Sequence, residues 1–555
     1  MILNRRTFLN ALKAACCAHA ISALRGATTG IAGGAVGSSA APPVDPWAFG
    51  AKFDGVTDDT PAWQAAINRA AATGRPVRPG RGGTSLLRCG PNPRGSYAAL
   101  PGMAVYQALD INFSNLTIDL AGSTLRLIGR GTQNAVNYAF GTALNIDRDL
   151  RHIRVRNGTI DFDPTGDPSI NKRAFYLVGV EGIYIEDLIL TSSGRRAGAT
   201  ITLQNCQSVT IQNIRCVNVT QGMNLSFVED VVLDTLLFDT FREAIDCDRK
   251  VSRLVARNLT FRNGGPTNQC LDLNSVVDAV ISGIHAHNVG NIALINYKLT
   301  TQETFPAWVR NDPARAFSPS KNIVIEKVRA DTICYPKSTT RPFILGNDQR
   351  SSAESAFPLE NITLRDVVLT NCPSFIPIEL VKNATIENFR FEGAVNPIPG
   401  MGCIDIRSDY PGTHTSVALR NVTIEMGPTA TRGVRATAPA WLRMSDVRVV
   451  GPSNGAAVLF QFVNLEKNNA IIQIEKVTAQ ARAGGIAFYF GGTGERYSVV
   501  WGSGNCVRGR FARVLSLNGS AAERMTGSGL PAFCGSSSFP GLSSKTSFRA
   551  LSRFQ

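Results

Sequence analysis

Acidic and other polar residues recur at matching places in short hydrophobic runs near the middle of this 555-residue chain. The runs are 222–226 (GMNLS), 244–248 (AIDCD) and 270–274 (CLDLN). Side chains alternate between the two faces of a β-strand, so inward hydrophobic residues would leave the polar residues outward. If the strands stack in register, one outward column holds Asn224, Asp246 and Asp272, with Ser226, Asp248 and Asn274 beside it. The pattern predicts three carboxylates crowded on one sheet face.

Such a cluster has the groups that hydrolysis of a glycosidic bond requires. One protonated carboxyl assists the leaving oxygen, and one ionised carboxylate activates water or attacks carbon. Strands about 4.8 Å apart would place Asp246 beside Asp272, and Asp248 would lie about 6.7 Å along the strand from Asp246. Repulsion between like charges raises the pKa of one carboxyl, as a general acid needs.

We therefore predict Asp246 and Asp272 as an acid–base pair and Asp248 as the water activator or charge partner. The pattern does not assign which carboxyl is the acid. The alternative is a solvated polar ladder without catalytic function.

The charge of the chain indicates a class of substrate. The 57 Lys and Arg residues outnumber the 42 Asp and Glu residues, and the formal net charge of +15 attracts anions. Basic residues are scattered among predicted turns, without a run of five, which favours an acidic polysaccharide over nucleic acid. The residues predicted to bind it are Asn224, Arg242, Arg249, Asn274, Lys298 and Trp308. Trp308 lies in one of two insertions, 299–320 and 334–358, which we expect to form loops on the binding face.

Repeated segments of strand, polar bend and strand indicate how these residues are positioned. Successive starts at Gly182, Ser208, Asp230, Arg253 and Asp278 are 26, 22, 23 and 25 residues apart. Such a unit buries its apolar side only by stacking on its neighbours. The repeats predict an all-β, right-handed parallel β-helix of about 12–13 coils. A leucine-rich repeat would need a helix and a Leu/Asn pattern that are missing, and a β-sandwich would not keep one period for so long.

Asparagine precedes the second strand in several repeats, and we expect it to adopt the left-handed backbone of a tight bend. The positions that share this pattern are Asn157, Asn213, Asn258 and Asn421.

A helix is predicted before the repeats. The segment 49–60 (FGAKFDGVTDDT) leads into Pro61–Ala72, with Asp59 or Thr60 as the cap and Gly74 as the stop. Apolar residues at helical spacing indicate a helix that covers the open end of a repeat array. We interpret Asp58 and Asp59 as part of a turn and helix N-terminus, not as catalytic residues.

This segment, followed by an Ala-rich helix, resembles the N-terminal start of pectate lyase superfamily proteins, which include polygalacturonase-related and rhamnogalacturonase/epimerase-like members. The resemblance implies a right-handed parallel β-helix. Asp246, Asp248 and Asp272 resemble the three clustered aspartates of the polygalacturonase group, which implies a glycoside hydrolase without a cofactor. The Asn-Thr-Asp, Asp-Asp, Gly-His-Gly and Arg-Ile-Lys landmarks of that group do not occur as such. Lys298 would replace the basic element, and we assign His285 and His287 to the surface.

Two other functions remain open. A polysaccharide lyase or uronate epimerase would need a base and a cation that neutralises the substrate carboxylate, and the aspartates could then hold Ca²⁺. A non-catalytic glycan-binding protein could use the same face. A product that absorbs in the ultraviolet would indicate a lyase, and new reducing ends without that absorbance would indicate a hydrolase.

The N-terminus predicts export. Residues 4–9 (NRRTFL), followed by an Ala-rich apolar stretch, resemble a twin-arginine signal, so we expect a periplasmic or secreted monomer. No apolar run reaches about 18 residues, so no membrane span is expected. The predicted organisation is signal and linker at 1–40, cap and first coils at 44–130, β-helix at 131–502, and C-terminal cap and tail at 503–555.

The cysteines give a structural prediction rather than a metal site. We expect Cys247 and Cys270 to be core thiols and consider disulfides for the pairs Cys206/Cys216 and Cys506/Cys534. The spacing of the cysteines is not that of a zinc site.

Overall fold

The structure is a computed structural model. It describes residues 41–533 except 92–103, 132–134, 143–148, 164, 166–170, 195–196, 297–318, 334–340, 347–358, 397–399, 409–414, 454–455, 466–468, 483, 492–497, 510, 519–524 and 527–531. From Pro43 onward the chain forms one compact unit. The twin-arginine segment lies outside the described residues. No helix among the described residues is long and apolar enough to cross a membrane.

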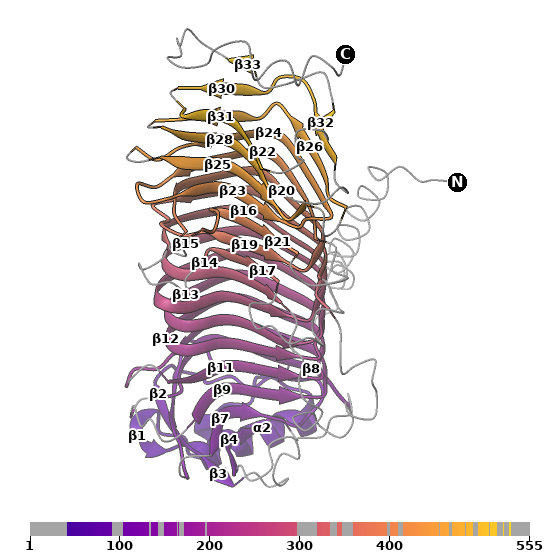
Figure 1. Ribbon diagram of the computed structural model, residues 1–555. Coiled ribbons are helices and arrows are strands. Elements are labelled where there is room, and N and C mark those ends of the chain that lie inside the picture. Colours follow the sequence, from indigo (N-terminus) through magenta and orange to yellow (C-terminus); the bar gives the residue numbers. More distant parts are fainter. Residues whose placement is uncertain are drawn as a thin grey trace, which may run out of the picture. The chain divides into compact units, whose positions relative to one another are not determined.

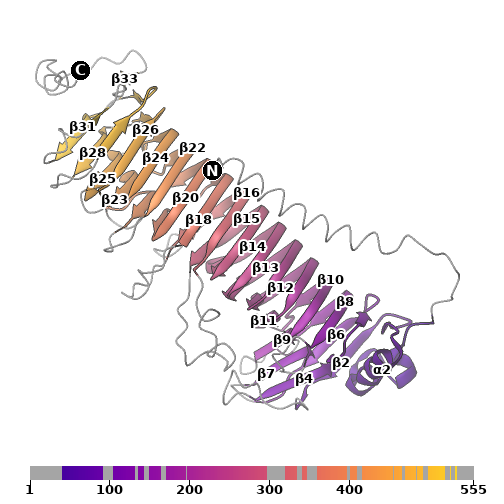
Figure 2. The same cartoon turned by 90° about the vertical axis from the view of Figure 1, so that its right-hand side faces the viewer.

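The predicted helix is present as α2, Thr60–Thr73, and it ends at Gly74, whose φ of 66° is left-handed. Its buried face, which includes Trp63 and Ile67, belongs to the hydrophobic core of the coils, and Figure 2 shows α2 at the indigo end of the stack. Asp59 occupies the N-cap position but its side chain does not cap the helix. Its carboxylate accepts hydrogen bonds from the backbone N–H groups of Lys52 (2.7 Å) and Phe53 (3.0 Å). The prediction of a turn and helix N-terminus is confirmed, while capping by the Asp59 side chain is wrong.

Apart from the short 3₁₀ helix η1, the remaining elements are strands. The elements before the long coils are η1 Pro46–Phe49, β1 Asp54–Asp58, β2 Thr84–Arg88, β3 Gly90–Pro91, β4 Val105–Asp110, β5 Leu116–Asp119, β6 Thr124–Ile128, β7 Val136–Gly141, β8 Leu150–Asp161, β9 Asn171–Val178, β10 Val180–Thr191 and β11 Ala197–Gln204. The central elements are β12 Gln207–Ser226, β13 Glu229–Arg249, β14 Val251–Asn274, β15 Val276–Asn296, β16 Lys321–Ile333, β17 Phe343–Leu345, β18 Leu359–Thr370, β19 Ile376–Glu379 and β20 Val381–Ala394. The remaining elements are β21 Ile404–Arg407, β22 Ser416–Met426, β23 Arg432–Thr437, β24 Trp441–Val450, β25 Ala457–Val463, β26 Ile471–Glu475, β27 Thr478–Gln480, β28 Gly485–Gly491, β29 Ser498–Trp501, β30 Cys506–Arg508, β31 Arg513–Asn518, β32 Met525–Thr526 and β33 Ala532–Phe533.

One coil of the stack shows how the sequence bends the chain. Within β12, Asn213 (φ 52°) and Asn218 (φ 57°) have left-handed backbones, and each turns the strand toward a new direction. Between these bends, Ile214 and Cys216 point into the core. Positive φ also occurs at Asn157, Asn258 and Asn421. The predicted role of these asparagines is confirmed, because Asn tolerates this conformation better than most residues.

Successive coils pair in parallel register and form the predicted right-handed parallel β-helix (Figure 1). The core stacks equivalent side chains on one another, as in the Phe238–Phe261 pair, whose ring centroids are 5.5 Å apart. Cys247 and Cys270 are buried free thiols, as predicted. Cys206 and Cys216 are also buried thiols that form no disulfide with each other, so the disulfide considered for this pair is wrong. Cys506 is disulfide-bonded, and Cys534 lies outside the described residues.

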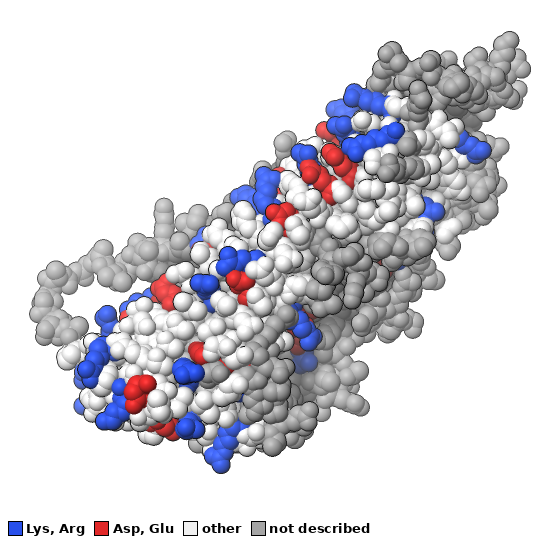
Figure 3. All heavy atoms as spheres, turned by 90° about the vertical axis from the view of Figure 1, so that its left-hand side faces the viewer, with Lys and Arg blue, Asp and Glu red and all other residues white. Residues whose placement is uncertain are grey.

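Several charged side chains on the outer surface of the central coils form ion pairs with the neighbouring coil. Arg257 lies 2.7 Å from Asp234, and Arg262 lies 2.8 Å from Asp239. Figure 3 shows basic and acidic side chains interspersed on one face of the molecule. Such pairs hold adjacent coils in register and compensate charge locally.

Asn213 provides a test of the bends. Asn213→Ala is expected to lower the free energy of unfolding by about 1–2 kcal/mol, because Ala is strained at positive φ and the hydrogen bond to Asp187 (2.6 Å) is lost. Asn213→Gly also loses that hydrogen bond but tolerates positive φ, so it should cost less. Chemical denaturation measures both variants. Equal losses for Ala and Gly would show that the left-handed bend is not the cause.

Candidate active site

The third strand of each coil brings the predicted acidic residues together. Asn224 of β12 is the register partner of Asp246 of β13, which is the partner of Asp272 of β14. Their neighbours in sequence, Met223, Leu225, Ile245, Cys247, Leu271 and Leu273, are all buried in the core. The three polar residues therefore share one outward column, as predicted from the alternation.

Asp248 departs from the predicted register. The pairing shifts between Leu225 and Ser226, so Ser226 lies opposite Arg249 and leaves Asp248 as the extra residue of a bulge. The prediction that Ser226 and Asp248 share one position is wrong, because a bulge places two residues opposite one. The bulge leaves Asp248 beside Arg249, with 3.6 Å between the Asp248 Oδ2 and the Arg249 Nε. Bulges often lie next to active sites, where they redirect a side chain.

Asp246 has an unusual environment for a carboxyl group. It is 8% exposed, and its Oδ2 accepts hydrogen bonds from Gln221 (2.6 Å) and Asn224 (2.9 Å). Its Oδ1 is buried and accepts no hydrogen bond from the described residues. Burial, followed by repulsion from the charges of Asp248 and Asp272, raises the pKa of Asp246 to about 8, although the Asn224 hydrogen bond opposes the shift. Asp246 is therefore mainly protonated at neutral pH.

Asp272 differs from its neighbour in the column. It is more exposed than Asp246, and its Oδ1 accepts a hydrogen bond of 2.7 Å from the Asn274 amide. Two register-matched carboxyl groups thus have different surroundings, one buried and one partly solvated. Pairs of this kind separate into an acid and a base.

The other predicted substrate-binding residues divide into three groups. Arg249 lies beside Asp248, while the exposed Arg242 forms an ion pair with Glu243 at 3.0 Å. Asn224 and Asn274 each donate to an aspartate of the column. Lys298 and Trp308 lie outside the described residues.

His285 and His287 are exposed and lie on the second straight segment of the coil that β15 forms. Their assignment to the surface is confirmed.

Two residues that sequence reasoning missed complete the cluster. The Gln221 Nε2 donates to Asp246 and to Glu243 (3.4 Å), and the charge of Glu243 also raises the pKa of Asp246. Gln221 and Glu243 precede Asn224 and Asp246 by three residues in the sequence. Strict alternation would place a side chain at that spacing on the opposite face of the strand. Gln221 and Glu243 are register partners, and that repetition in consecutive coils is the signal that could have identified them.

The described residues contain no group of three or more His, Cys, Asp or Glu side chains arranged to hold a metal ion.

Comparisons with known proteins concern the fold. No family model matches the chain. No curated protein matches it. Among solved structures, a variant tailspike protein of E. coli bacteriophage HK620 in complex with a pentasaccharide is 12% identical, over 79% of this chain and 76% of that chain, with a TM-score of 0.46.

Two further structures show similar values. The A-module of the Azotobacter vinelandii mannuronan C-5 epimerase AlgE4 is 13% identical, over 88% of this chain and 100% of that chain, with a TM-score of 0.33. A family 28 exopolygalacturonase of Yersinia enterocolitica is 12% identical, over 70% of this chain and 79% of that chain, with a TM-score of 0.36. At the level of the fold, this chain has the parallel β-helix that its resemblance to the pectate lyase superfamily implied.

Proposed function

We propose that this protein is a glycoside hydrolase that cleaves an acidic polysaccharide, with Asp246 as the general acid. The observation that carries the proposal is the buried Asp246 carboxyl, which has a pKa of about 8 and lies in register with a second aspartate. A general acid in glycoside hydrolysis must hold its proton at neutral pH while a neighbouring carboxylate stays ionised.

The partners of Asp246 fit the remaining roles. Asp272, partly solvated and held by Asn274, is proposed as the base that activates water. Asp248, beside the Arg249 guanidinium, is proposed as the charge partner that helps to keep the proton on Asp246. In the reaction, Asp246 gives its proton to the leaving glycosidic oxygen and Asp272 takes a proton from the attacking water.

The substrate and location follow from charge and the N-terminal segment. The formal net charge of +15 supports an anionic chain as substrate, and residues 4–9 support export by a twin-arginine route. Arg249 and Arg242, together with Lys298 and Trp308, are the proposed contacts to this substrate.

Purified protein incubated with polygalacturonate, alginate and sulfated glycans tests the reaction. The expected result is new reducing ends on one of these polymers without absorbance from an unsaturated sugar. Product that absorbs in the ultraviolet would replace the hydrolase proposal with a lyase.

Asn224 offers a test of the acid through pH dependence. Its hydrogen bond lowers the pKa of Asp246, so Asn224→Leu should raise that pKa further and move the alkaline limb of kcat to higher pH. Thr202, the register partner of Asn224 in the preceding coil, provides the control variant Thr202→Val, which should leave that limb in place. If the alkaline limb of kcat does not move in Asn224→Leu, Asp246 is not the group whose pKa sets that limb.

A further inference from the structure

The sheet face that carries Asp246 continues into the later coils. From Asp272 the register passes through Leu294 and Ile344 to β19 and reaches Asp405 of β21 and Arg435 of β23. It then continues to Gln461 and Tyr489. Arg435 is six coils from Asp246, so the two positions are about 29 Å apart at about 4.8 Å per coil.

Along this face the sign of the charge reverses. Glu243 and Asp246 of β13 are three residues apart, and the corresponding positions of β23 are Arg432 and Arg435. The first pair is adjacent to two more aspartates, while the second lies beside Arg407 and one buried aspartate, Asp405. One face therefore has an acidic region and a basic region.

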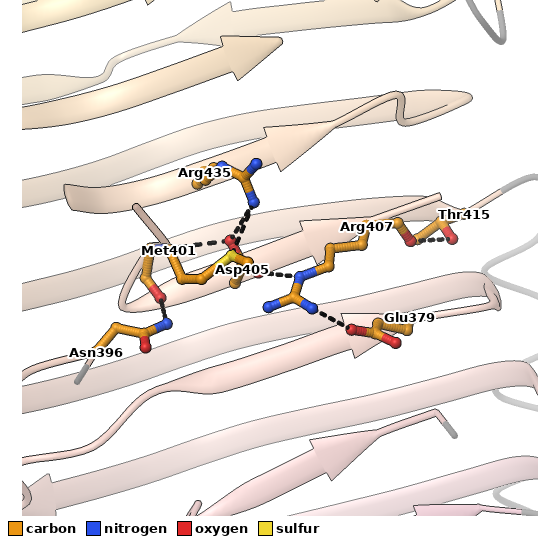
Figure 4. A network of polar contacts seen from close by, with 8 residues as sticks. Glu379, Asn396, Met401, Asp405, Arg407, Thr415 and Arg435 are labelled. Carbon is orange, nitrogen blue, oxygen red and sulfur yellow. Dashed lines mark hydrogen bonds and ion pairs between the residues drawn. The ribbon is translucent and has the colours of Figure 1, made fainter. Parts of the chain in front are cut away.

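A network of ion pairs supports the basic region (Figure 4). Asp405 is completely buried and forms ion pairs with Arg407 and with Arg435, the latter at 3.2 Å. Arg407 also lies 2.9 Å from Glu379. The Gly402 N–H donates to Asp405 at 3.2 Å. The carboxylates of Asp405 and Glu379 thus form ion pairs with the guanidinium groups of Arg407 and Arg435, and these pairs hold Arg435 in place.

Arg432 is a further cation beside this matched network. Within the described residues it forms no ion pair. Arg432 and Arg435 both lie on β23, three residues apart. Burial, followed by repulsion from Arg435, lowers the pKa of Arg432, although the charge of Asp405 opposes the shift. Gly400 leaves room for it, because a Cβ there would lie 2.6 Å from the Arg432 Nη1. The energetic cost of placing two guanidinium groups together falls when an anion binds between them.

The next two coils extend this surface with groups that suit a sugar. Gln461 and Tyr489 follow Arg435 in the outward column and are both partly exposed. The Gln461 Oε1 is itself buried and accepts no hydrogen bond from the described residues. An amide and a phenol can exchange hydrogen bonds with hydroxyl groups.

We propose that Arg432 and Arg435, with Gln461 and Tyr489, form a binding site for the anionic group of an acidic saccharide, separate from the aspartates. The inference rests on the proposed function for its ligand class, a carboxylate or sulfate ester on a sugar. Because both sites share one outward column, a single polymer lying along the coils can reach both. The site therefore favours long chains as substrates.

Binding measurements test this site. The Asp272→Asn protein, in which the probe is not consumed, is titrated by calorimetry with a galacturonate hexamer, a sulfated carrageenan hexamer and neutral maltohexaose. Arg432→Gln in this background should weaken binding of the anionic hexamer about tenfold, as expected for loss of a charge-assisted contact. The hexamer that binds identifies carboxylate or sulfate as the ligand group.

Arg443→Gln is the matched control, because Arg443 is a partly exposed arginine of β24 on another face, 4.0 Å from Glu475. It should leave the affinity unchanged. Arg432→Lys keeps the charge, so it should bind more tightly than Arg432→Gln, and equal melting temperatures show that the variants fold.

Equal affinities of Arg432→Gln and Arg443→Gln, or no binding of either anionic hexamer, would overturn the site. Weaker binding in Arg432→Gln without cleavage of any polymer by the wild-type protein would keep the site and remove the hydrolase. Cleavage by the wild-type protein with unchanged affinity in Arg432→Gln would keep the hydrolase and remove the site.

Discussion

Asp246→Asn is expected to lower kcat on a cleaved acidic glycan by about 100- to 10,000-fold, the contribution typical of a general acid. Asn has nearly the same shape as Asp but no acidic proton to give to the leaving oxygen. The side chain can still hydrogen-bond to Gln221 and Asn224, which contact Asp246 in the wild type. The loss should therefore appear in kcat while the protein stays folded. Initial rates of reducing-end formation measure it.

Asp239→Asn is the matched control for this experiment. Asp239 also lies on β13, but on the second strand of the coil, where it pairs with Arg262 at 2.8 Å. The same change of charge should therefore leave kcat unchanged. Similar kcat values for wild type and Asp246→Asn would remove Asp246 from the mechanism.

The stability of the wild-type protein is expected to fall, relative to Asp246→Asn, as the pH rises from about 4 to about 9. Burial and neighbouring charges raise the pKa of Asp246 from 3.8 to about 8, so the folded state binds more protons than the unfolded state between these values. The stabilisation is fully present below the unfolded pKa and is lost as the pH rises through the folded pKa. A shift of this size corresponds to at most about 6 kcal/mol.

Chemical denaturation at a series of pH values measures this difference. The stability of the wild-type protein relative to Asp239→Asn should change with pH in the opposite direction. Although burial raises the pKa of Asp239, hydrogen bonds from Asn263 and Arg262 hold it below the usual value. The stability that Asp239 contributes is therefore lost as the pH falls. A constant difference between wild type and Asp246→Asn from pH 4 to 9 would show that Asp246 titrates normally.

The fold could be predicted because each level of the sequence agrees with the others. The period of 22 to 26 residues, the alternation within strands and the asparagines at bends all require the same stacking. In-register parallel pairing then aligns Asp246 with Asp272, so the central column of the candidate site could be predicted without knowledge of side-chain contacts.

The details of the site could not be predicted in the same way. The bulge at Asp248 changes the local register, and a bulge leaves no signature in the hydrophobic pattern. Gln221 reaches Asp246 because the chain bends after Asn218, where the two-residue period fails. A disulfide between Cys206 and Cys216 was wrong because both thiols are inward core residues.

The basic region was missed for a different reason. Insertions lengthen the two intervals before Asn361 to 44 and 39 residues, so the repeat period no longer predicts which later residues share the column of Asp246. Only the register places Arg435 there. Arg432 and Arg435 also look ordinary in a chain with 57 basic residues.

Titration of the Asp246 carboxyl tests the central claim most directly, because it needs no knowledge of the substrate. The side-chain carboxyl carbons are labelled with ¹³C in aspartate, and the Asp246 signal is assigned by its absence from Asp246→Asn. The expected midpoint is near pH 8. A midpoint near the ordinary value of 3.8 would mean that Asp246 is ionised at neutral pH, and it would contradict its role as the acid.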